Sequence, residues 1–557
     1  MRAGTRWFAA GAAAGVLLGA GAFVVAAPVG ADTSDPAAAT HGDPVVAEFV
    51  DETAESGMRT VYDGGFTFFV GGGVATFDCD DDELPDVYVA GGQNPAGLYR
   101  NTSEPGGSLS FEPVDDEAAA LSAVTGAYPL DVDSDGRVDL AVLRVGENRL
   151  LRGLGDCRFA DATQQWALPV ADDWTAAFSA TWEPASTLPT VAVGNYLEVP
   201  PEGEVVRECA TSYLVRPDPS GDSLGDPVPL QPGLCTLSVL FHDWDASGRS
   251  DLRMANDRHY YAEGSEQLWR VEANEAPSLY TEADGWRPMS IWGMGIAVAD
   301  VAGDERPEVV LTSQGDNKLQ TLDDESGAPS YADIAIRAGT TAHRPFMGDS
   351  TFPSTAWHPQ WADVNNDGHV DLYLSKGNVD SQGDHAPDDP SNLMLGRGDG
   401  TFTESARDAG VVSVGLGRGA AVVDLNADGM LDLIEVNRSE VTRVWRNVGS
   451  GTAQEPATIG SWLALRLRQP APNPDAVGAW VEVRTDDGTQ RQQVLVGGGH
   501  ASGRHGWLHW GLGTAAEADV RVTWPDGEQT GWQPVDANTF AVVDRGDARV
   551  EVVEPGG

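Results

Sequence analysis

Short apolar runs alternate with acidic turns along most of the chain. Residues 73–77 form a small, apolar run that leads into the acidic loop 78–86, and a second apolar run, 87–89, follows directly. The same order recurs around the acidic loop 363–371, which reads D-V-N-N-D-G-H-V-D. Short apolar runs bounded by Asp, Asn and Gly favour β-strands joined by tight turns over long helices. The pattern therefore predicts a repeat built from β-hairpins.

The acidic turns recur at a regular spacing. They begin at Asp78, Asp131, Asp243, Asp300, Asp363 and Asp424, and residues 178–193 form a further repeat that has the strand pattern but no acidic ladder. A spacing of roughly 50 to 60 residues suits one four-stranded propeller blade with long loops. We therefore predict an all-β chain with a seven-bladed β-propeller over residues 45–450.

The last repeat lacks its fourth strand. After Arg446 the chain enters a linker, 451–460, that has no aromatic strand. At the other end of the repeat region, residues 48–53 resemble residues 401–405, which open the fourth strand of the sixth repeat. We expect the N-terminal segment to complete the last blade, because this closure would remove an exposed sheet edge.

Two segments flank the repeats. Residues 461–553 contain alternating apolar positions, as in 480–483 and 520–522, and are expected to form a small β-sandwich-like domain. Residues 1–31 combine Arg2 and Arg6 with a long apolar stretch and small residues at 29–31, and residues 32–44 form a polar linker. The N-terminal segment is a cleaved signal peptide or an uncleaved membrane anchor, so the body is expected to be secreted or displayed on the cell surface.

Four cysteines are then free to form disulfides. An even number in an exported chain is consistent with two bridges, and sequence alone leaves their pairing open. We prefer Cys209 with Cys235, which leaves Cys79 with Cys157.

The net charge of the chain limits the classes of molecule that it can bind. The 557 residues include 85 acidic and 35 basic ones, which gives a net charge of −50. This charge disfavours nucleic acid and anionic membranes, and favours bound cations. The 17 tryptophans and a hydrophobic content of 41% argue against disorder.

The acidic turns carry oxygen-bearing side chains at positions 1, 3, 5 and 9, and most carry glycine at position 6. Such a curled loop directs several oxygens at one hard cation of the size of Ca²⁺. The alternative is a set of solvated Asp-rich turns without metal. The candidate ligands are Asp78, Asp80, Asp82, Asp86, Asp131, Asp133, Asp135, Asp139, Asp243, Asp245, Ser247, Asp251, Asp363, Asn365, Asp367, Asp371, Asp424, Asn426, Asp428 and Asp432.

These loops predict about five Ca²⁺ sites. The repeat around residue 182 has no acidic ladder, and the loop from Asp300 has Ala302 at position 3, so it lacks one ligand. In the first loop Glu83 replaces the glycine of position 6, which predicts a distorted turn. An EF-hand fits poorly, because its loop needs a glutamate at position 12 and only Glu435 supplies one.

The repeated D-x-[DN]-x-D-G-x-x-D loops resemble FG-GAP/VCBS-repeat propellers, and more closely the cartilage acidic protein (CRTAC) family. The segment after Ser461 resembles an ASPIC/UnbV domain through residues 473–479, 497–500 and 522–527. The resemblance implies Ca²⁺ in the loops, a secreted or surface-exposed protein, and a role in binding or adhesion.

An enzyme has less support in the sequence. No zinc-protease motif, phosphate loop or C-x-x-C pair occurs. We expect a non-enzymatic, monomeric binding module for an extracellular protein or glycan. The alternative is a polysaccharide-binding or lyase-type propeller that uses Arg258, His259 and Tyr260. An asparagine near the end of each second strand, such as Asn148, suggests either a ligand ring or simple turn chemistry.

Overall fold

A computed structural model describes residues 43–169, 172–199, 208–257, 265–323, 327–546 and 549–556. These residues belong to one compact unit, Gly42–Gly557. The expected signal or anchor segment lies outside the described residues, as do Arg258, His259 and Tyr260. Within the described ranges, no helix has the length and apolar character needed to cross a membrane.

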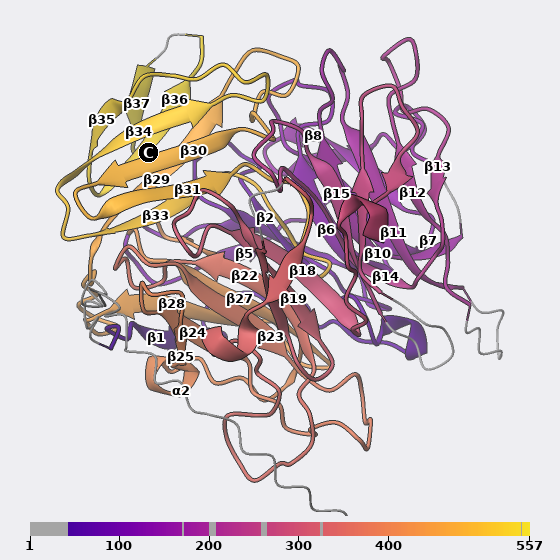
Figure 1. Ribbon diagram of the computed structural model, residues 1–557. Coiled ribbons are helices and arrows are strands. Elements are labelled where there is room, and N and C mark those ends of the chain that lie inside the picture. The colour runs from indigo at the N-terminus through magenta and orange to yellow at the C-terminus, as the bar shows by residue number, and fades with distance from the viewer. Residues whose placement is uncertain are drawn as a thin grey trace, which may run out of the picture. The chain divides into compact units, whose positions relative to one another are not determined.

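The chain is all-β and folds into a propeller of four-stranded units (Figure 1). In each unit, consecutive strands pair in antiparallel fashion, as β22, β23, β24 and β25 do. The strands in chain order, unit by unit, are β2 (Val74–Phe77), β3 (Asp86–Val89), β4 (Gly97–Asn101) and β5 (Phe111–Pro113); β6 (Val124–Leu130), β7 (Asp139–Gly146), β8 (Arg149–Gly155) and β9 (Arg158–Asp161); β10 (Asp173–Thr181), β11 (Thr190–Glu198), β12 (Ser212–Val215) and β13 (Val228–Leu230); β14 (Thr236–His242), β15 (Asp251–Asn256), β16 (Gln267–Arg270) and β17 (Ser278–Leu279); β18 (Gly293–Ala299), β19 (Glu308–Ser313), β20 (Lys318–Leu322) and β21 (Tyr331–Asp333); β22 (Ala356–Ala362), β23 (Asp371–Lys376), β24 (Asn392–Gly396) and β25 (Phe402–Glu404); β26 (Leu416–Val423), β27 (Asp432–Arg438) and β28 (Arg443–Gly449), completed by β1 (Glu48–Asp51).

The first strands of successive units contact one another in chain order, and β26 of the last unit contacts β2 of the first. The ring is therefore closed. Apolar side chains fill the space between units, as where Val142 and Leu140 pack with Phe77 and Val87. Burial of this kind is the main favourable term in folding, so each unit depends on its neighbours.

The N-terminal strand completes the last unit, which confirms the expected latch. Strand β1 pairs with β28, and Phe49 lies opposite Asn447. Directly after β1, the Glu52 carboxylate accepts a hydrogen bond from Nε of buried Arg446 at 2.9 Å. The two ends of the repeat region are thus joined by a strand pair and a buried ion pair, and β1 covers the edge that β28 would otherwise expose.

Short helical turns occur between units. They are η1 (Phe66–Phe68), η2 (Glu282–Asp284), α1 (Ala335–Ala338) and α2 (Ala406–Ala409). The two α-helical turns each follow a fourth strand and end at a glycine in the left-handed region, Gly339 and Gly410. Glycine adopts that conformation without strain, which explains why the turn stops there.

The C-terminal segment forms two four-stranded sheets with a shared apolar core, as the alternating pattern predicted. The core contains Leu463, Val481, Trp510 and Val522. One sheet has the order β33-β29-β36-β37 and the other β31-β30-β34-β35. The eight sandwich strands are β29 (Ser461–Arg468), β30 (Trp480–Thr485), β31 (Gly488–Gln493), β33 (Leu508–Gly513), β34 (Glu517–Thr523), β35 (Gln533–Asp536), β36 (Thr539–Asp544) and β37 (Arg549–Val553). The short strand β32 (Gly503–Arg504) lies between β31 and β33 in the chain and belongs to neither sheet.

One loop of this sandwich runs through the centre of the propeller. Residues 494–504, which we call the plug, form backbone bridges to first strands of four units: Val496 to Ala180, Gly497 to Leu240, Gly499 to Ile296 and Ser502 to Ala127. In addition, β32 pairs with β2. Side-chain and backbone contacts reach the remaining first strands at His358 of β22 and Gly419 of β26. The plug therefore occupies the channel that a propeller ring encloses.

Glycines make this close packing of backbone on backbone possible. A Cβ atom added at Gly73 would lie 1.8 Å from the Ala501 carbonyl oxygen, and one added at Gly126 would lie 2.1 Å from the same atom. In the plug, Gly497, Gly498 and Gly499 all have positive φ. Other residues adopt such angles with strain, so the run of three glycines is needed for the path of the plug.

Both preferred disulfides are present. Cys79 is bonded to Cys157, and Cys209 is bonded to Cys235. The first bridge links neighbouring units and the second closes a loop of the third unit. Two disulfides fit a protein that matures outside the reducing cytosol.

Two buried histidines hold the plug. His500 accepts a hydrogen bond at Nε2 from the Gly71 amide (3.1 Å), and its own amide donates to Nδ1 of His358 (3.0 Å). Burial lowers the pKa of His500 to about 3 and that of His358 to about 4, and the charges of Arg418 and Arg504 lower them further. Both rings are therefore neutral in the folded protein at neutral pH.

We expect these histidines to make the protein sensitive to acid. Their folded pKa values lie below the unfolded value of about 6.5, so their contribution is complete above pH 6.5 and is lost as the pH falls toward 4. Together they should remove about 3 kcal/mol of unfolding free energy between pH 6.5 and 5. Denaturant unfolding at several pH values, compared between wild type and the double variant His358→Gln/His500→Gln, measures this slope. The exposed His343→Gln variant should keep the wild-type slope, and equal slopes in all three proteins would contradict the assignment.

Candidate metal centres in the blade hairpins

The acidic loops connect the first and second strands of their units. We number each hairpin by its unit: the first is 78–86, the second 131–139, the fourth 243–251, the fifth 300–308, the sixth 363–371 and the seventh 424–432. In each of them, position 9 is the first residue of the second strand. The loops thus have a fixed start and end on the sheet.

The position 1 carboxylate shapes the turn. In the second hairpin, Asp131 accepts hydrogen bonds from the amides of Asp135 (3.1 Å) and Gly136 (2.8 Å). Asp363 does the same for Asp367 and Gly368 in the sixth hairpin. These bonds curl the loop around its own first side chain, as a turn-forming Asp does.

Glu83 does not distort the first turn, so that expectation was wrong. Glu83 adopts φ +70°, close to the +84° of Gly136 at the same position of the second hairpin. Its amide donates to Asp78 at 2.9 Å, in the same way as the Gly136 amide donates to Asp131. The hydrogen bond holds the strained left-handed backbone in place, at an energetic cost that glycine avoids.

The position 9 carboxylate joins three strands. Asp139 accepts hydrogen bonds from the Val132 amide in the loop (2.8 Å) and from the Gly153 amide in β8 (2.7 Å). Asp86, Asp371 and Asp432 make the equivalent pairs of bonds. Burial is the main cause that raises the pKa of Asp139 to about 8, and nearby Asp131 and Asp133 raise it further.

The remaining oxygens form a donor set suited to a hard cation. Carboxylate oxygens of Asp131, Asp133 and Asp139 lie within 4.8 Å of one another, as do those of the first hairpin at positions 1, 3 and 9. At position 3, one buried oxygen in each of the first, second and seventh hairpins has no hydrogen-bond partner among the described atoms: Oδ1 of Asp80, Asp133 and Asn426. Arg100 and Arg152 form ion pairs with the other oxygen, Oδ2, of Asp80 and Asp133, at 2.7 and 2.8 Å. The buried Oδ1 atoms stay unpaired, which is costly without a further cation, so these residues fit Ca²⁺.

The sixth and seventh hairpins are the most buried. Burial raises the pKa of Asp424 to about 8, and the charge of Asp428 raises it further. The same two causes raise the pKa of Asp363 well above its usual range, with Asp367 as the neighbouring charge. Both loops carry oxygen-bearing side chains at positions 1, 3, 5 and 9.

The fourth hairpin carries a cation of its own. Arg249, at position 7, donates from Nε and Nη2 to the two oxygens of Asp251, each at 3.1 Å. Trp244 and Tyr280 also donate to this carboxylate. Burial is the largest single influence on the pKa of Asp251 and raises it, but the hydrogen bonds from Arg249, the Val271 amide, Trp244 and Tyr280 together lower it more, so the net shift is downward. The acidic pattern of the loop gives no indication of this role of Arg249.

The fifth and third hairpins also differ from the full pattern. In the fifth, Glu308 accepts the Val301 amide at 2.9 Å and so takes the structural role of position 9, but Ala302 offers no side-chain oxygen. The third hairpin has no acidic ladder; its Glu183 instead pairs with Arg216 at 2.6 Å.

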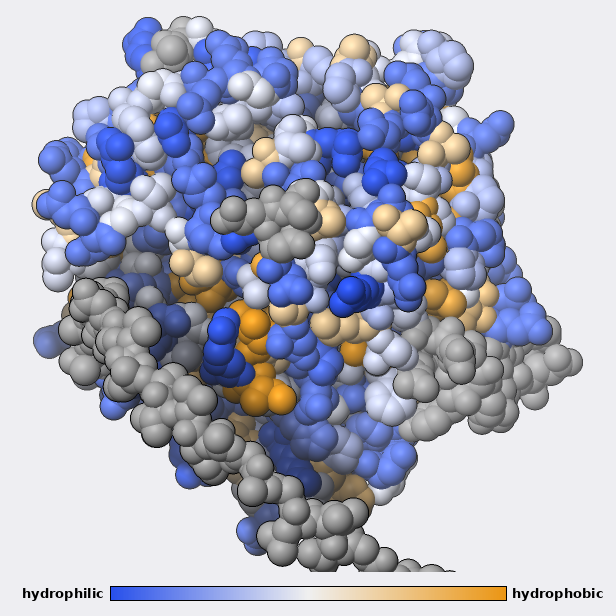
Figure 2. All heavy atoms as spheres, viewed as in Figure 1, coloured by the Kyte–Doolittle hydropathy of each residue, from blue (hydrophilic) through white to orange (hydrophobic). Residues whose placement is uncertain are grey.

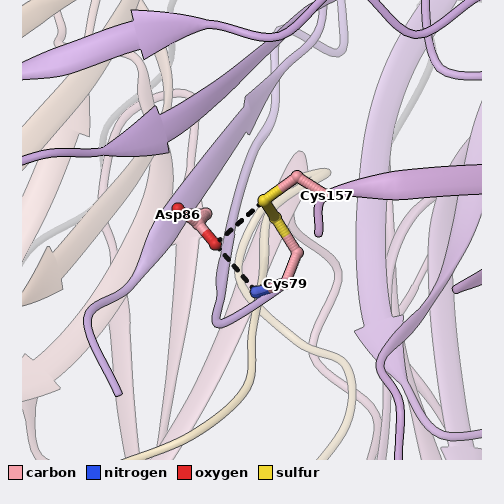
Figure 3. Close-up of side chains that lie close together, drawn as sticks. All are labelled: Cys79, Asp86 and Cys157. Atoms are coloured by element: carbon pink, nitrogen blue, oxygen red, sulfur yellow. Dashed lines mark hydrogen bonds between the residues drawn. A yellow bond between two sulfur atoms is a disulfide. The ribbon is translucent and has the colours of Figure 1, made fainter. Parts of the chain in front are cut away.

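Figure 3 shows a second group of metal-binding residue types, Cys79, Cys157 and the Asp86 carboxylate. The two sulfurs are bonded to each other, so they are not available as thiolate ligands. Cys79 is position 2 of the first hairpin, and its amide donates to Asp86 at 2.8 Å. The disulfide therefore attaches the first hairpin to the turn between β8 and β9 of the next unit.

The hairpins also contact the C-terminal sandwich. Trp480 Nε1 donates to Asp243 (3.2 Å), and Trp507 Nε1 donates to the Glu83 carbonyl (3.1 Å). Arg466 forms an ion pair with Glu83, at 2.8 Å. Sequence reasoning missed these contacts, because no local pattern indicates which residues meet across two domains.

The asparagines and aromatics do not form an open binding ring. Asn195 and Asn256 are fully buried and bonded to neighbouring threonines, Thr175 and Thr236. Trp357 is also fully buried, and its Nε1 donates to the Gly377 carbonyl. Turn and packing chemistry therefore accounts for these residues.

Comparisons with known proteins agree with the fold. Residues 78–142 match the model of the FG-GAP-like repeat, and residues 469–550 match that of ASPIC and UnbV. Cartilage acidic protein 1 of Xenopus tropicalis is 26% identical over 250 residues, 42% of this chain and 34% of the relative. The Mus musculus protein is 27% identical over 240 residues, again 34% of its length. The match thus spans about a third of these relatives.

Among solved structures, BBS1N in complex with ARL6DN is 10% identical with a TM-score of 0.41, covering 73% of this chain and all of that one. YCF48 from Cyanidioschyzon merolae is 10% identical with a TM-score of 0.39, covering 72% of this chain and 99% of that one. The chain combines an FG-GAP-like propeller with a C-terminal ASPIC/UnbV domain, as its resemblance to the cartilage acidic protein family predicted.

Proposed function

We propose that the chain is an exported Ca²⁺-binding propeller that acts as a binding or adhesion module. The observation that carries the metal part is the set of converging hairpin oxygens, with an unpaired buried oxygen at position 3 of three hairpins. In the first, second, sixth and seventh hairpins, one Ca²⁺ each would neutralise the clustered carboxylates and hold the turn. The ion is structural in this proposal, and positions 1, 3, 5 and 9 supply its side-chain ligands.

The position of the plug narrows where a partner binds. Backbone of residues 494–504 lies against the first strands of the propeller, so the channel is filled from within the chain. A partner then meets the outer loops or the sandwich. The face seen in Figure 2 is mostly hydrophilic, with a small hydrophobic area left of centre. Such a surface favours an extracellular protein or glycan that is recognised mainly through polar contacts.

A direct test uses the full chain immobilised in Ca²⁺ or in EGTA. A glycan array and a panel of purified surface proteins are probed in both buffers, and polysaccharide turnover is assayed in parallel. The proposal predicts retention of a defined glycan or protein in Ca²⁺ and loss of retention in EGTA. Cleavage of a polysaccharide would instead support the lyase alternative. That alternative rests on Arg258, His259 and Tyr260, and the described residues add no support to it.

The Arg249→Gln variant tests whether the Arg249 guanidinium takes the place of Ca²⁺ in the fourth hairpin. Replacing Arg249 with Gln frees both oxygens of Asp251 from the guanidinium, so the variant is expected to bind one more Ca²⁺ per chain than wild type. Native mass spectrometry at matched free Ca²⁺ counts the ions. Arg137→Gln is the matched control, since Arg137 holds the same loop position in the second hairpin but lies 3.7 Å from Asp135 and is half exposed. An unchanged count in Arg249→Gln would show that the guanidinium does not occupy the site.

A further inference from the structure

Lysine is rare in this chain, and one lysine is completely buried. The sequence has 33 arginines and only two lysines, Lys318 and Lys376. Lys376 is the last residue of β23, and Asp389 lies in the loop that leads to β24. The Lys376 Nζ atom is 2.8 Å from Asp389 Oδ1, and neither side chain is exposed to solvent. An amine and a carboxyl are therefore held in contact away from water.

The contact is poorly arranged for an ion pair. Lys376 Nζ makes no hydrogen bond to any described atom, although an ammonium group has three protons to donate. The carboxyl, in contrast, is fixed: Ser354 Oγ donates to Oδ1 at 2.7 Å and the Thr355 amide donates to Oδ2 at 2.6 Å. A buried ion pair is favourable only when hydrogen bonds satisfy both partners. Here the lysine side is left unsatisfied.

We propose that Lys376 and Asp389 condense to form an intramolecular isopeptide bond. One ammonium proton passes to Asp389 Oδ1, 2.8 Å away. The freed Nζ lone pair then attacks Asp389 Cγ, the new N–C bond forms, and the C–Oδ1 bond breaks. Two protons from the ammonium group leave with Oδ1 as one water molecule, so the ion pair supplies every atom of the amide and of the water. No oxidant, metal or external acyl donor is needed, because the reaction is a dehydration between neighbours.

The surrounding groups are placed to assist this reaction. The Thr355 amide points at Oδ2, where negative charge develops when Nζ adds to Cγ, and Ser354 donates to the oxygen that leaves. Fixed contact between the reacting atoms replaces a bimolecular encounter. Glu404, a nearby half-buried carboxyl, has its pKa raised by burial to about 7, and Lys376 acts on it in the opposite direction. Such a group accepts and returns a proton near neutral pH.

The bond would fix the loop between β23 and β24. This loop contains Asp380, which forms an ion pair with Arg438 of the neighbouring unit, and Asn378, whose side chain caps the loop backbone. A covalent link between residues 376 and 389 closes the loop in the unfolded chain as well as in the folded one. It thereby reduces the entropy gained on unfolding, as other cross-links do. This role does not depend on Ca²⁺ or on a partner.

Peptide mass spectrometry of the denatured full chain tests the proposal. The protein is unfolded, treated exhaustively with an amine-acylating reagent and digested with a protease that does not need lysine. We expect Lys318 to be fully acylated, and Lys376 to be found only in a branched peptide with Asp389 that is one water lighter than the sum of its parts. Lys318 is an internal control, because it also pairs with an aspartate, Asp333, at 3.0 Å but is partly exposed. Acylated Lys376 in a linear peptide would overturn the proposal.

Variants give a second readout. Lys376→Arg and Asp389→Ala each remove one reacting group, so the branched peptide should be absent from both. Lys318→Arg should leave it unchanged. If a variant does not fold, the wild-type digest alone still decides the question. A branched peptide that persists in Asp389→Ala would place the bond on a different carboxyl and contradict the assignment.

Discussion

Removing Ca²⁺ with excess EGTA is expected to lower the unfolding temperature by several degrees. Each occupied hairpin contributes about 1.4 kcal/mol when free Ca²⁺ is ten times its dissociation constant. Loading of the first, second, sixth and seventh hairpins then amounts to about 6 kcal/mol, if the sites act independently. The physical cause is the repulsion between carboxylates such as Asp424 and Asp428, which the ion neutralises. Differential scanning calorimetry with and without chelator measures the shift.

Site variants connect this shift to the hairpins. Asp133→Asn removes a position 3 ligand charge from the second hairpin, and it should reduce the difference between the two calorimetric curves. Asp218→Asn is the matched control, since Asp218 shapes an exposed turn outside the hairpins through the Ser220 and Gly221 amides. The Asp218→Asn variant should show the same shift of unfolding temperature on chelation as wild type. Superimposable wild-type curves with and without chelator would contradict a stabilising role of the ion.

The second large effect is expected from Gly73→Ala. The new methyl group would meet the Ala501 carbonyl oxygen at 1.8 Å, so the plug or β2 must move. Overpacking of this kind costs roughly 1–3 kcal/mol or more. Here the methyl group meets a backbone carbonyl, which cannot rotate away as a flexible side chain can. We expect a lower unfolding temperature and faster proteolysis within residues 494–504. Limited proteolysis followed by mass spectrometry locates the cuts.

Gly65→Ala is the control for that experiment. A Cβ atom at Gly65 has no neighbour within 4 Å, and its φ of −73° suits any residue. This variant should unfold and digest like wild type. A Gly73→Ala protein with the same properties would show that the plug is not packed against β2.

The repeat could be predicted from the sequence because its defining residues lie close together in the chain. Positions 1, 3, 5 and 9 of each loop lie within a few residues, and their spacing alone predicts a curled turn. The Glu48–Asp51 latch was also predictable, since a missing strand at one end matched a spare strand at the other. The even cysteine count predicted two bridges but left their pairing open, and only the fold shows which cysteines are bonded.

The path of the plug through the propeller could not be predicted from any local sequence pattern. Residues 497–499 look like the glycine run of an ASPIC/UnbV-like segment, and nothing nearby indicates that they cross the first strands of another domain. The only signal was indirect: glycines at 73, 126 and 419, each in a first strand or directly before one, leave room for foreign backbone.

Arg249 shows the limit of counting ligands. The fourth loop has oxygen-bearing side chains at positions 1, 3, 5 and 9. Its sequence therefore predicts a Ca²⁺ site, as in the first, second, sixth and seventh loops. A guanidinium at position 7 reaches Asp251, whereas Arg137 at the same position of the second loop stays outside. The difference depends on Trp244 and Tyr280, which hold the carboxylate toward Arg249, and these contacts require the folded structure.

Counting bound Ca²⁺ on the intact chain tests the central claim most directly. Native mass spectrometry of the chain at neutral pH in micromolar free Ca²⁺ should show one ion in each of the first, second, sixth and seventh hairpins. Each ion should disappear when the position 1 aspartate of its hairpin, Asp78, Asp131, Asp363 or Asp424, is replaced with Asn. A chain that carries no Ca²⁺ under these conditions, or the same number in all four variants, would contradict the account.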